Sequence, residues 1–148
     1  KNGATFITLI CYEVLFPNFV RKYLNQTPSL PHFIVNLTND SWYGNTSEPY
    51  QHLFLSKWRA VEMQIPIVRA TNTGISTVIY PTGENGPSLG VYKEGILEVE
   101  LKTAPTKATL YLQYGLLNIF ILWVILALII WYQPKITEIL RELNRADE

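Results

Sequence analysis

The chain has 148 residues, enough for about one domain, and its 12 basic and 12 acidic residues give a formal net charge of zero. This balance argues against a nucleic-acid partner, which needs a basic surface. The single cysteine, Cys11, excludes an intramolecular disulfide and a cysteine-cluster zinc site. Because His32 and His52 lack metal-ligand spacing, we expect surface or capping roles for both and no metal or other cofactor.

Strands and helices alternate over the first two thirds of the chain. In chain order we expect a strand over 4–11, a helix over 17–25, a strand over 32–38, a loop over 39–49, a helix over 50–64, strands over 67–70 and 76–80, a turn cluster over 81–87 and a strand over 95–101. Early strand–helix–strand units followed by hairpins predict an α/β domain with a mixed sheet layered against helices. Because the chain starts at Lys1, almost directly before a strand, we expect it to be part of a longer protein.

The last third of the chain contains a long apolar segment. No charged residue lies between Lys107 and Lys135, and a helix over 111–132 would be about 33 Å long, against roughly 30 Å for a hydrocarbon core. We therefore predict a transmembrane helix within 108–134, followed by an amphipathic tail over 135–148. The alternative is a buried core helix, which rarely runs so long without a charge.

Cys11 closes an apolar, β-rich run and is followed at once by Tyr12 and Glu13. A strand end is rigid, and its last side chain can face a cleft, which suits a nucleophile. A cysteine reacts only as the thiolate, and the sequence shows no obvious positive partner for it. By residue type alone, an inert buried cysteine is the more common case.

Residues 9–17, LICYEVLFP, resemble the cysteine motif of the nitrilase (carbon–nitrogen hydrolase) superfamily. Four further segments follow in the family's order: NLTNDSWYG at 36–44, QHL at 51–53, RAVE at 59–62 and RATNTGIS at 69–76. With the apolar segment behind them, they look like the C-terminal part of the superfamily's membrane-bound N-acyltransferases, which acylate bacterial lipoproteins. The resemblance extends over residues 5–132.

The resemblance implies part of an α-β-β-α sandwich over residues 1–107, followed by one C-terminal transmembrane helix. It also implies a Glu-Lys-Cys triad in which Cys11 is the nucleophile. Cys11 would take an acyl chain from a phospholipid as a thioester and pass it to the diacylglyceryl-cysteine at the N-terminus of a lipoprotein. The family's Glu and Lys precede the cysteine motif, so chain order excludes Glu13 and Lys57 and predicts that residues 1–148 alone are inactive.

The resemblance also suggests supporting residues. Tyr12 and Glu13 match positions that the family needs beside the nucleophile, although Glu13 could equally belong to a structural hydrogen-bond network. Trp42, Tyr43 and Asn39 are candidate substrate contacts in a loop bordering the site. Loop packing is the alternative for the two aromatic residues, and turn formation is the more common role for the asparagine. A bacterial inner-membrane location is implied, with the catalytic domain on the periplasmic side.

Two other functions stay open from the sequence. A soluble-type amidase or nitrilase of the same superfamily would use the same cysteine, but it would need no bilayer anchor. A non-catalytic, membrane-anchored interaction module would keep the fold and lack the triad. A Glu and a Lys at the family positions upstream would distinguish the transferase from this module.

Overall fold

A computed structural model describes residues 3–101 and 107–146 of the chain. The chain divides into two compact units, Lys1–Gln113 and Tyr114–Glu148. The elements of the first unit are β1 (Phe6–Ile10), η1 (Cys11–Leu15, a 3-10 helix), α1 (Pro17–Asn25), β2 (Phe33–Thr38), η2 (Ser41–Tyr43, a 3-10 helix), α2 (Glu48–Met63), β3 (Ile67–Thr71), β4 (Ser76–Ile79) and β5 (Asn85–Leu89).

The strands form one sheet in the order β1-β2-β3-β4-β5. The first three strands are parallel, and β4 and β5 are antiparallel to their neighbours, so the predicted mixed sheet is confirmed. The register places Leu9, Asn36 and Arg69 side by side on β1, β2 and β3. This row matters for the site, because it places two polar side chains at the centre of an otherwise apolar face.

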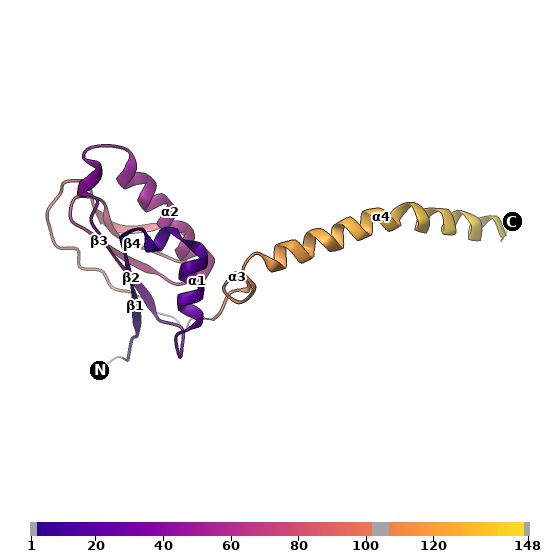
Figure 1. The fold of residues 1–148 in the computed structure, drawn as a ribbon, viewed down its shortest axis with the longest axis horizontal. Helices are drawn as coiled ribbons and strands as arrows, with labels where there is room; N and C mark the ends of the chain where they lie inside the picture. Colours follow the sequence, from indigo (N-terminus) through magenta and orange to yellow (C-terminus); the bar gives the residue numbers. More distant parts are fainter. Residues whose placement is uncertain (1–2, 102–106, 147–148) are drawn as a thin grey trace. The chain divides into compact units, whose positions relative to one another are not determined.

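Helices α1 and α2 cover one face of the sheet (Figure 1). Pro17 fits the first turn of α1, where its missing N–H costs nothing. Gln64 ends α2 in the left-handed conformation just before Pro66, which cannot continue a helix. The core between helices and sheet is built from side chains that are at most 8% exposed: Ile7, Leu9, Val20, Leu24, Ile34, Leu53, Ala60, Met63 and Ile67.

The strand expected over 95–101 is wrong, and the turn cluster expected over 81–87 is confirmed only over 81–84. The chain reverses at Gly83, whose φ of +84° favours glycine, and the Gly83 N–H donates to the Tyr80 carbonyl at 2.8 Å. Residues Asn85–Leu89 therefore return at once beside β4 and pair with it as β5, despite their Gly and Pro.

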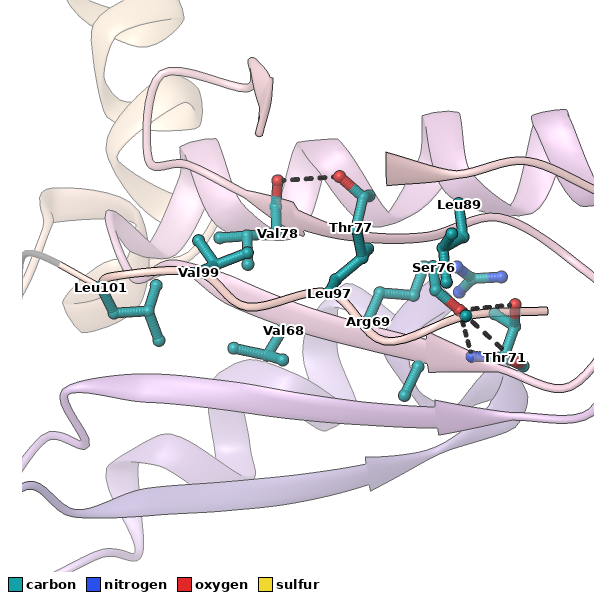
Figure 2. Close-up of a pocket in the computed structure, with 12 residues that line it drawn as sticks. Val68, Arg69, Thr71, Ser76, Thr77, Val78, Leu89, Leu97, Val99 and Leu101 are labelled. Carbon is teal, nitrogen blue, oxygen red and sulfur yellow. Dashed lines mark hydrogen bonds between the residues drawn. The ribbon is translucent and has the colours of Figure 1, made fainter. Parts of the chain in front are cut away.

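The 95–101 segment lies instead over the face of the sheet that the helices leave open. Leu97, Val99 and Leu101 line a cavity of about 370 Å³ together with Val68 and Val78 of the sheet (Figure 2). The apolar and acidic residues alternate because the apolar side chains face the sheet, although the segment pairs with no described strand.

The first unit ends with the short α3 (Leu110–Tyr114), whose Leu112 belongs to the hydrophobic core. The second unit is mainly one apolar helix, α4 (Leu117–Ala146). The apolar helix starts at Leu117 instead of residue 111, because Gly115 has a φ of +61° and breaks the helix. Within the described residues, Leu117–Lys135 is the one helix long and apolar enough to cross a membrane, with 19 residues and a mean hydropathy of 1.9. It would span about 28 Å. The backbone of the predicted tail continues α4 to Ala146, and most side chains on which its amphipathic character depends lie outside the described residues.

Candidate active site

Cys11 lies at the carboxyl end of β1 and is the first residue of η1. Its φ is +49°, in the left-handed region that residues with a Cβ rarely adopt. Such a conformation costs of order 1–3 kcal/mol and persists only where the surroundings enforce it. The thiol is half-buried and not in a disulfide, so the nucleophile predicted from sequence has a fixed and partly accessible position.

Asn36 of β2 holds the backbone around this turn. Its Nδ2 donates to the carbonyl oxygens of Leu9 at 3.1 Å and Cys11 at 3.3 Å. The side chain is fully buried. A buried carboxamide needs partners for both its oxygen and its nitrogen, and here the nitrogen finds them on both sides of the strand end.

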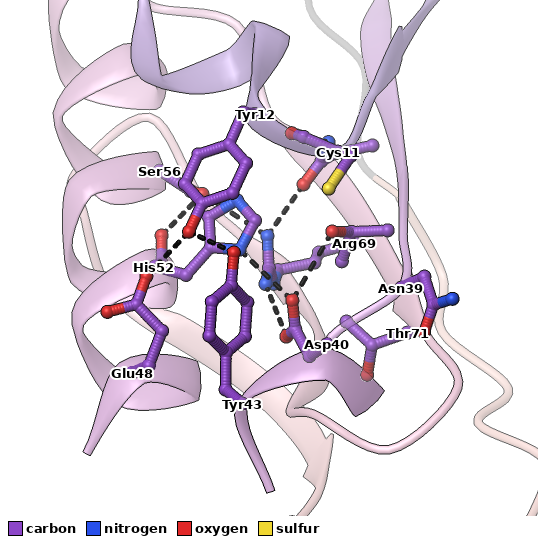
Figure 3. A network of polar contacts seen from close by, with 12 residues as sticks. Cys11, Tyr12, Asn39, Asp40, Tyr43, Glu48, His52, Ser56, Arg69 and Thr71 are labelled. Carbon is purple, nitrogen blue, oxygen red and sulfur yellow. Dashed lines mark hydrogen bonds and ion pairs between the residues drawn. The ribbon is translucent and has the colours of Figure 1, made fainter. Parts of the chain in front are cut away.

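The oxygen of Asn36 accepts a hydrogen bond of 2.7 Å from Nη1 of Arg69 on β3. Nη2 of the same guanidinium forms a 2.9 Å ion pair with Oδ2 of Asp40, and both side chains are buried (Figure 3). Burial lowers the pKa of Arg69, while the negative charge of Asp40 opposes this shift. The guanidinium therefore links Asn36 of β2 to Asp40.

Asp40 connects this ion pair to helix α2. Its Oδ1 lies 3.1 Å from Nδ1 of His52. Burial alone would raise the pKa of Asp40, but the hydrogen bond with His52 and the charge of Arg69 outweigh burial and hold that pKa below its ordinary value. A Cβ added to Gly74 would lie only 2.0 Å from Oδ2 of Asp40, so the carboxylate needs a glycine beside it.

The surface or capping role expected for His52 is wrong, because its side chain is completely buried. His52 lies on the core side of α2, where the Asp40 carboxylate supplies the partner that a buried imidazole needs. The ring of Tyr12 stacks on the imidazole, with centroids 5.0 Å apart and planes 10° apart. His32 is half-buried and accepts a 3.1 Å hydrogen bond from the Thr5 N–H.

The structure brings together Tyr12 and Tyr43, two of the residues selected from the sequence. The Tyr43 hydroxyl donates to the Tyr12 hydroxyl, which in turn donates to Oε1 of Glu48 at 2.9 Å. The hydrogen bond with Tyr43, partial burial and the Glu48 carboxylate all raise the pKa of Tyr12, so its phenol stays protonated. This cluster ties η1 and η2 to the first turn of α2.

Glu13 has a local structural contact. Its Oε2 accepts a 2.7 Å hydrogen bond from the N–H of Ile10. The carbonyl of Thr5 accepts from the N–H of His32, and the carbonyl of Leu9 accepts from Asn36, so both point toward β2. Because backbone groups alternate in direction along a strand, the N–H of Ile10 points to the opposite edge of β1. The carboxylate of Glu13 therefore accepts from a backbone N–H that has no strand partner in the described sheet, next to Cys11 in the chain. This contact matches the structural hydrogen-bond role considered for Glu13.

Asn39 and Trp42 are not linked to Cys11 by a hydrogen bond in the described structure. Oδ1 of Asn39 accepts from the N–H and Oγ of Ser41 at 3.1 and 2.6 Å, the pattern of an Asx turn. Trp42 is 83% exposed on η2 and is free to contact other molecules. Arg59 and Glu62, about one turn apart on α2, form an ion pair with an N–O distance of 2.8 Å.

Sequence reasoning missed the buried polar network as a unit. Asn36, Asp40 and Arg69 received no site role, and His52 was expected only in a surface or capping role. A usable signal existed, because a polar residue inside a continuous apolar strand is expensive to bury without a partner. Asn36 in FIVNLT and Arg69 in IVRAT are such residues. Among the described residues, no cluster of three or more His, Cys, Asp or Glu side chains could hold a metal ion.

The chain is similar in sequence to known proteins. A family model described as carbon-nitrogen hydrolase matches residues 3–111. Two relatives named apolipoprotein N-acyltransferase, from Rhodopseudomonas palustris and Bradyrhizobium diazoefficiens, are 43% and 45% identical to the chain over 114 residues. Each alignment covers 77% of this chain and 20% of the relative, so the chain spans about a fifth of the length of these relatives.

A solved structure also shares the fold. The carbon-nitrogen hydrolase from Helicobacter pylori G27 aligns with a TM-score of 0.50 at 10% sequence identity. The alignment covers 64% of this chain and 42% of that one. At this identity, the likeness concerns the fold alone.

Proposed function

Because the chain belongs to the carbon–nitrogen hydrolase family, we propose that it is the C-terminal part of an enzyme that N-acylates bacterial lipoproteins, with Cys11 as the nucleophile. One observation carries the proposal. Cys11 lies at a strand end with a left-handed backbone, and its carbonyl accepts a hydrogen bond from the buried polar network. The chain is 43–45% identical to relatives whose names state this activity.

The proposed reaction has two acyl transfers. The Cys11 thiolate attacks the ester carbonyl of a phospholipid, a C–S bond forms, the C–O bond breaks, and the released lysophospholipid oxygen takes a proton. The α-amino group of a lipoprotein's diacylglyceryl-cysteine then attacks the thioester, an amide C–N bond forms, and the thiol is regenerated as the amine loses its proton. A Glu base and a Lys that stabilises the oxyanion complete the triad, and we place both upstream of Lys1.

The residues around Cys11 fit supporting roles in this scheme. Glu13 fixes the edge of β1, and Tyr12 covers the buried imidazole of His52 with a phenol that stays protonated. Tyr43 is held against Tyr12, and the exposed indole of Trp42 is suited to contact acyl chains. Asn39 would then act on substrate through the shape of its turn.

The membrane setting rests on the similarity to the named relatives and on helix α4. We propose that α4 crosses the bacterial inner membrane over Leu117–Lys135, with the catalytic domain on the periplasmic side and the residues after the span in the cytoplasm. Its exposed apolar side chains support this role, since none of the spanning segment is buried within the described residues. On the face of the sheet opposite the helices, the 95–101 segment covers part of β3 and β4, while Phe6, Ile10 and Leu37 of β1 and β2 are exposed. This exposed part is where we propose that the second sheet of an α-β-β-α sandwich packs.

The experiment uses the full-length protein in detergent micelles, with phospholipid and a diacylated lipopeptide as substrates. We expect acyl transfer and a hydroxylamine-labile acyl adduct on Cys11, both absent from Cys11→Ser. Lys57→Met is the matched control, because chain order excludes Lys57 from the triad, and it should retain both signals. An adduct that persists in Cys11→Ser would remove Cys11 from the role. Release of free fatty acid, with no transfer to the lipopeptide, would instead favour a hydrolase.

A further inference from the structure

Asn36 uses both ends of its carboxamide at the strand end that carries Cys11. We propose that Asn36 is a positioning residue that fixes the carbonyls of Leu9 and Cys11 and so aims the Cys11 thiol, and that Arg69 and Asp40 hold Asn36 in this orientation. The inference rests on the proposed function, in which Cys11 is the nucleophile.

The orientation of the carboxamide follows from its partners. The Arg69 guanidinium can only donate hydrogen bonds, so the group facing it at 2.7 Å must be the oxygen of Asn36. The NH₂ group then points to β1, where it meets the carbonyls of Leu9 and Cys11. A rotation by 180° would place donors against donors and acceptors against acceptors. Arg69 thus selects the one orientation in which Asn36 can hold the turn.

The turn needs such a restraint, because Cys11 has a φ of +49°. Without external hydrogen bonds, a residue with a Cβ would relax toward negative φ and move its side chain. Asn36 holds the inner side of the strand end, and Glu13 holds the opposite edge through the Ile10 N–H. The two contacts together fix the direction in which the Cys11 Cβ leaves the backbone.

Arg69 in turn requires Asp40. A buried guanidinium without a counter-charge is costly, and Asp40 pairs with it at 2.9 Å in a place that Gly74 leaves free. The register of the sheet explains why the parts meet, since Asn36 lies beside Arg69 on neighbouring strands and beside Leu9 on the other side. A line of contacts therefore runs from Asp40 through Arg69 and Asn36 to the nucleophile.

The test variant is Asn36→Asp in the full-length protein. Aspartate keeps an oxygen for Arg69 but replaces the donor that faces the two carbonyls with an acceptor. We expect kcat for acyl transfer to fall about 10²-fold, as a misplaced reacting group does, while KM for phospholipid changes less than about threefold. Alkylation of Cys11 by iodoacetamide, measured by mass spectrometry on the tryptic peptide of residues 2–21, should slow in parallel. Asn36→Ser, whose hydroxyl is too short to reach both carbonyls, is a second variant in case the first does not fold.

Thr77→Val is the matched control. Thr77 is equally buried on β4, and its hydroxyl donates to the Pro87 carbonyl at 3.0 Å. We expect this variant to lose stability without slowing transfer or alkylation. The inference is overturned if the folded Asn36 variants keep kcat and the alkylation rate within twofold, or if Thr77→Val loses as much of both. Full activity in Cys11→Ala would instead refute the proposed function, so the two failures are distinguishable.

Discussion

Gly74→Ala should break the buried ion pair between Asp40 and Arg69. The new Cβ would lie 2.0 Å from Oδ2, 2.8 Å from Cγ and 3.0 Å from Cβ of Asp40. Because nonbonded heavy atoms essentially never approach a Cβ within 3.0 Å, the carboxylate oxygen must move by about 1 Å or more. Such a movement can stretch the 2.9 Å contact with Arg69 and the 3.1 Å contact with His52 beyond hydrogen-bonding range.

The cost follows from this displacement. Breaking a buried ion pair typically costs 3–5 kcal/mol, and overpacking a core alone costs about 1–3 kcal/mol. We therefore expect Gly74→Ala to lower the free energy of unfolding by about 3 kcal/mol. The measurement is urea unfolding of the full-length protein in detergent, followed by tryptophan fluorescence. Gly90→Ala is the matched control, since its added Cβ would meet only Lys93 Cγ at 3.9 Å.

A double-variant comparison tests the mechanism itself. In an Asp40→Ala background the clashing carboxylate is gone, so adding Gly74→Ala should then cost less than about 0.5 kcal/mol. A loss of about 3 kcal/mol for Gly74→Ala in the Asp40→Ala background would refute the proposed clash. The clash would also be refuted by a single Gly74→Ala variant as stable as Gly90→Ala.

Three further outcomes are expected. The pKa of Asp40 in the folded protein lies below its unfolded value of about 3.9. Its ion pair therefore stabilises the fold above that pH, and this stabilisation is lost as the pH falls through the folded pKa. In Asp40→Asn, the free energy of unfolding in urea should then depend less on pH between pH 6 and 3. Tyr12→Phe should cost about 1 kcal/mol in the same assay, since it loses the hydroxyl contacts and keeps the ring stack on His52; a loss above 3 kcal/mol would contradict this. Trp42→Ala should leave stability within about 0.5 kcal/mol and raise KM for phospholipid in a transfer assay, and an unchanged KM would exclude a lipid contact.

The early strands and both helices could be predicted from the sequence because their signals are local. β-Branched runs identified β1 to β4, and proline positions marked the start of α1 and the end of α2. β5 could not be found in this way, since its pairing depends on the reversal at Gly83 and not on the β-propensity of Asn85–Leu89. The break at Gly115 was missed for the same reason, because a single glycine gives a weak local signal.

The site was only partly predictable. Resemblance to a family motif selected Cys11, Tyr12, Glu13 and Tyr43 as candidates, and the structure brings Tyr12 and Tyr43 into contact. The role of Asn36 depends on strand register, which places it beside Arg69 and within reach of the Cys11 carbonyl. Register arises from pairing between segments far apart in the chain, so it cannot be read from either segment alone.

The sequence by itself determined a strand that ends in a single cysteine, the alternating elements around it and an apolar helix long enough for a bilayer. Periodicity, proline placement and hydropathy are local properties, and they need no knowledge of neighbours. Only the tertiary structure decided that His52 is buried, that Asp40 pairs with Arg69, and that Asn36 holds the left-handed turn at Cys11. The physical reason is that a buried polar group is stable only with its partners, and folding brings those partners together from separate strands, loops and helices.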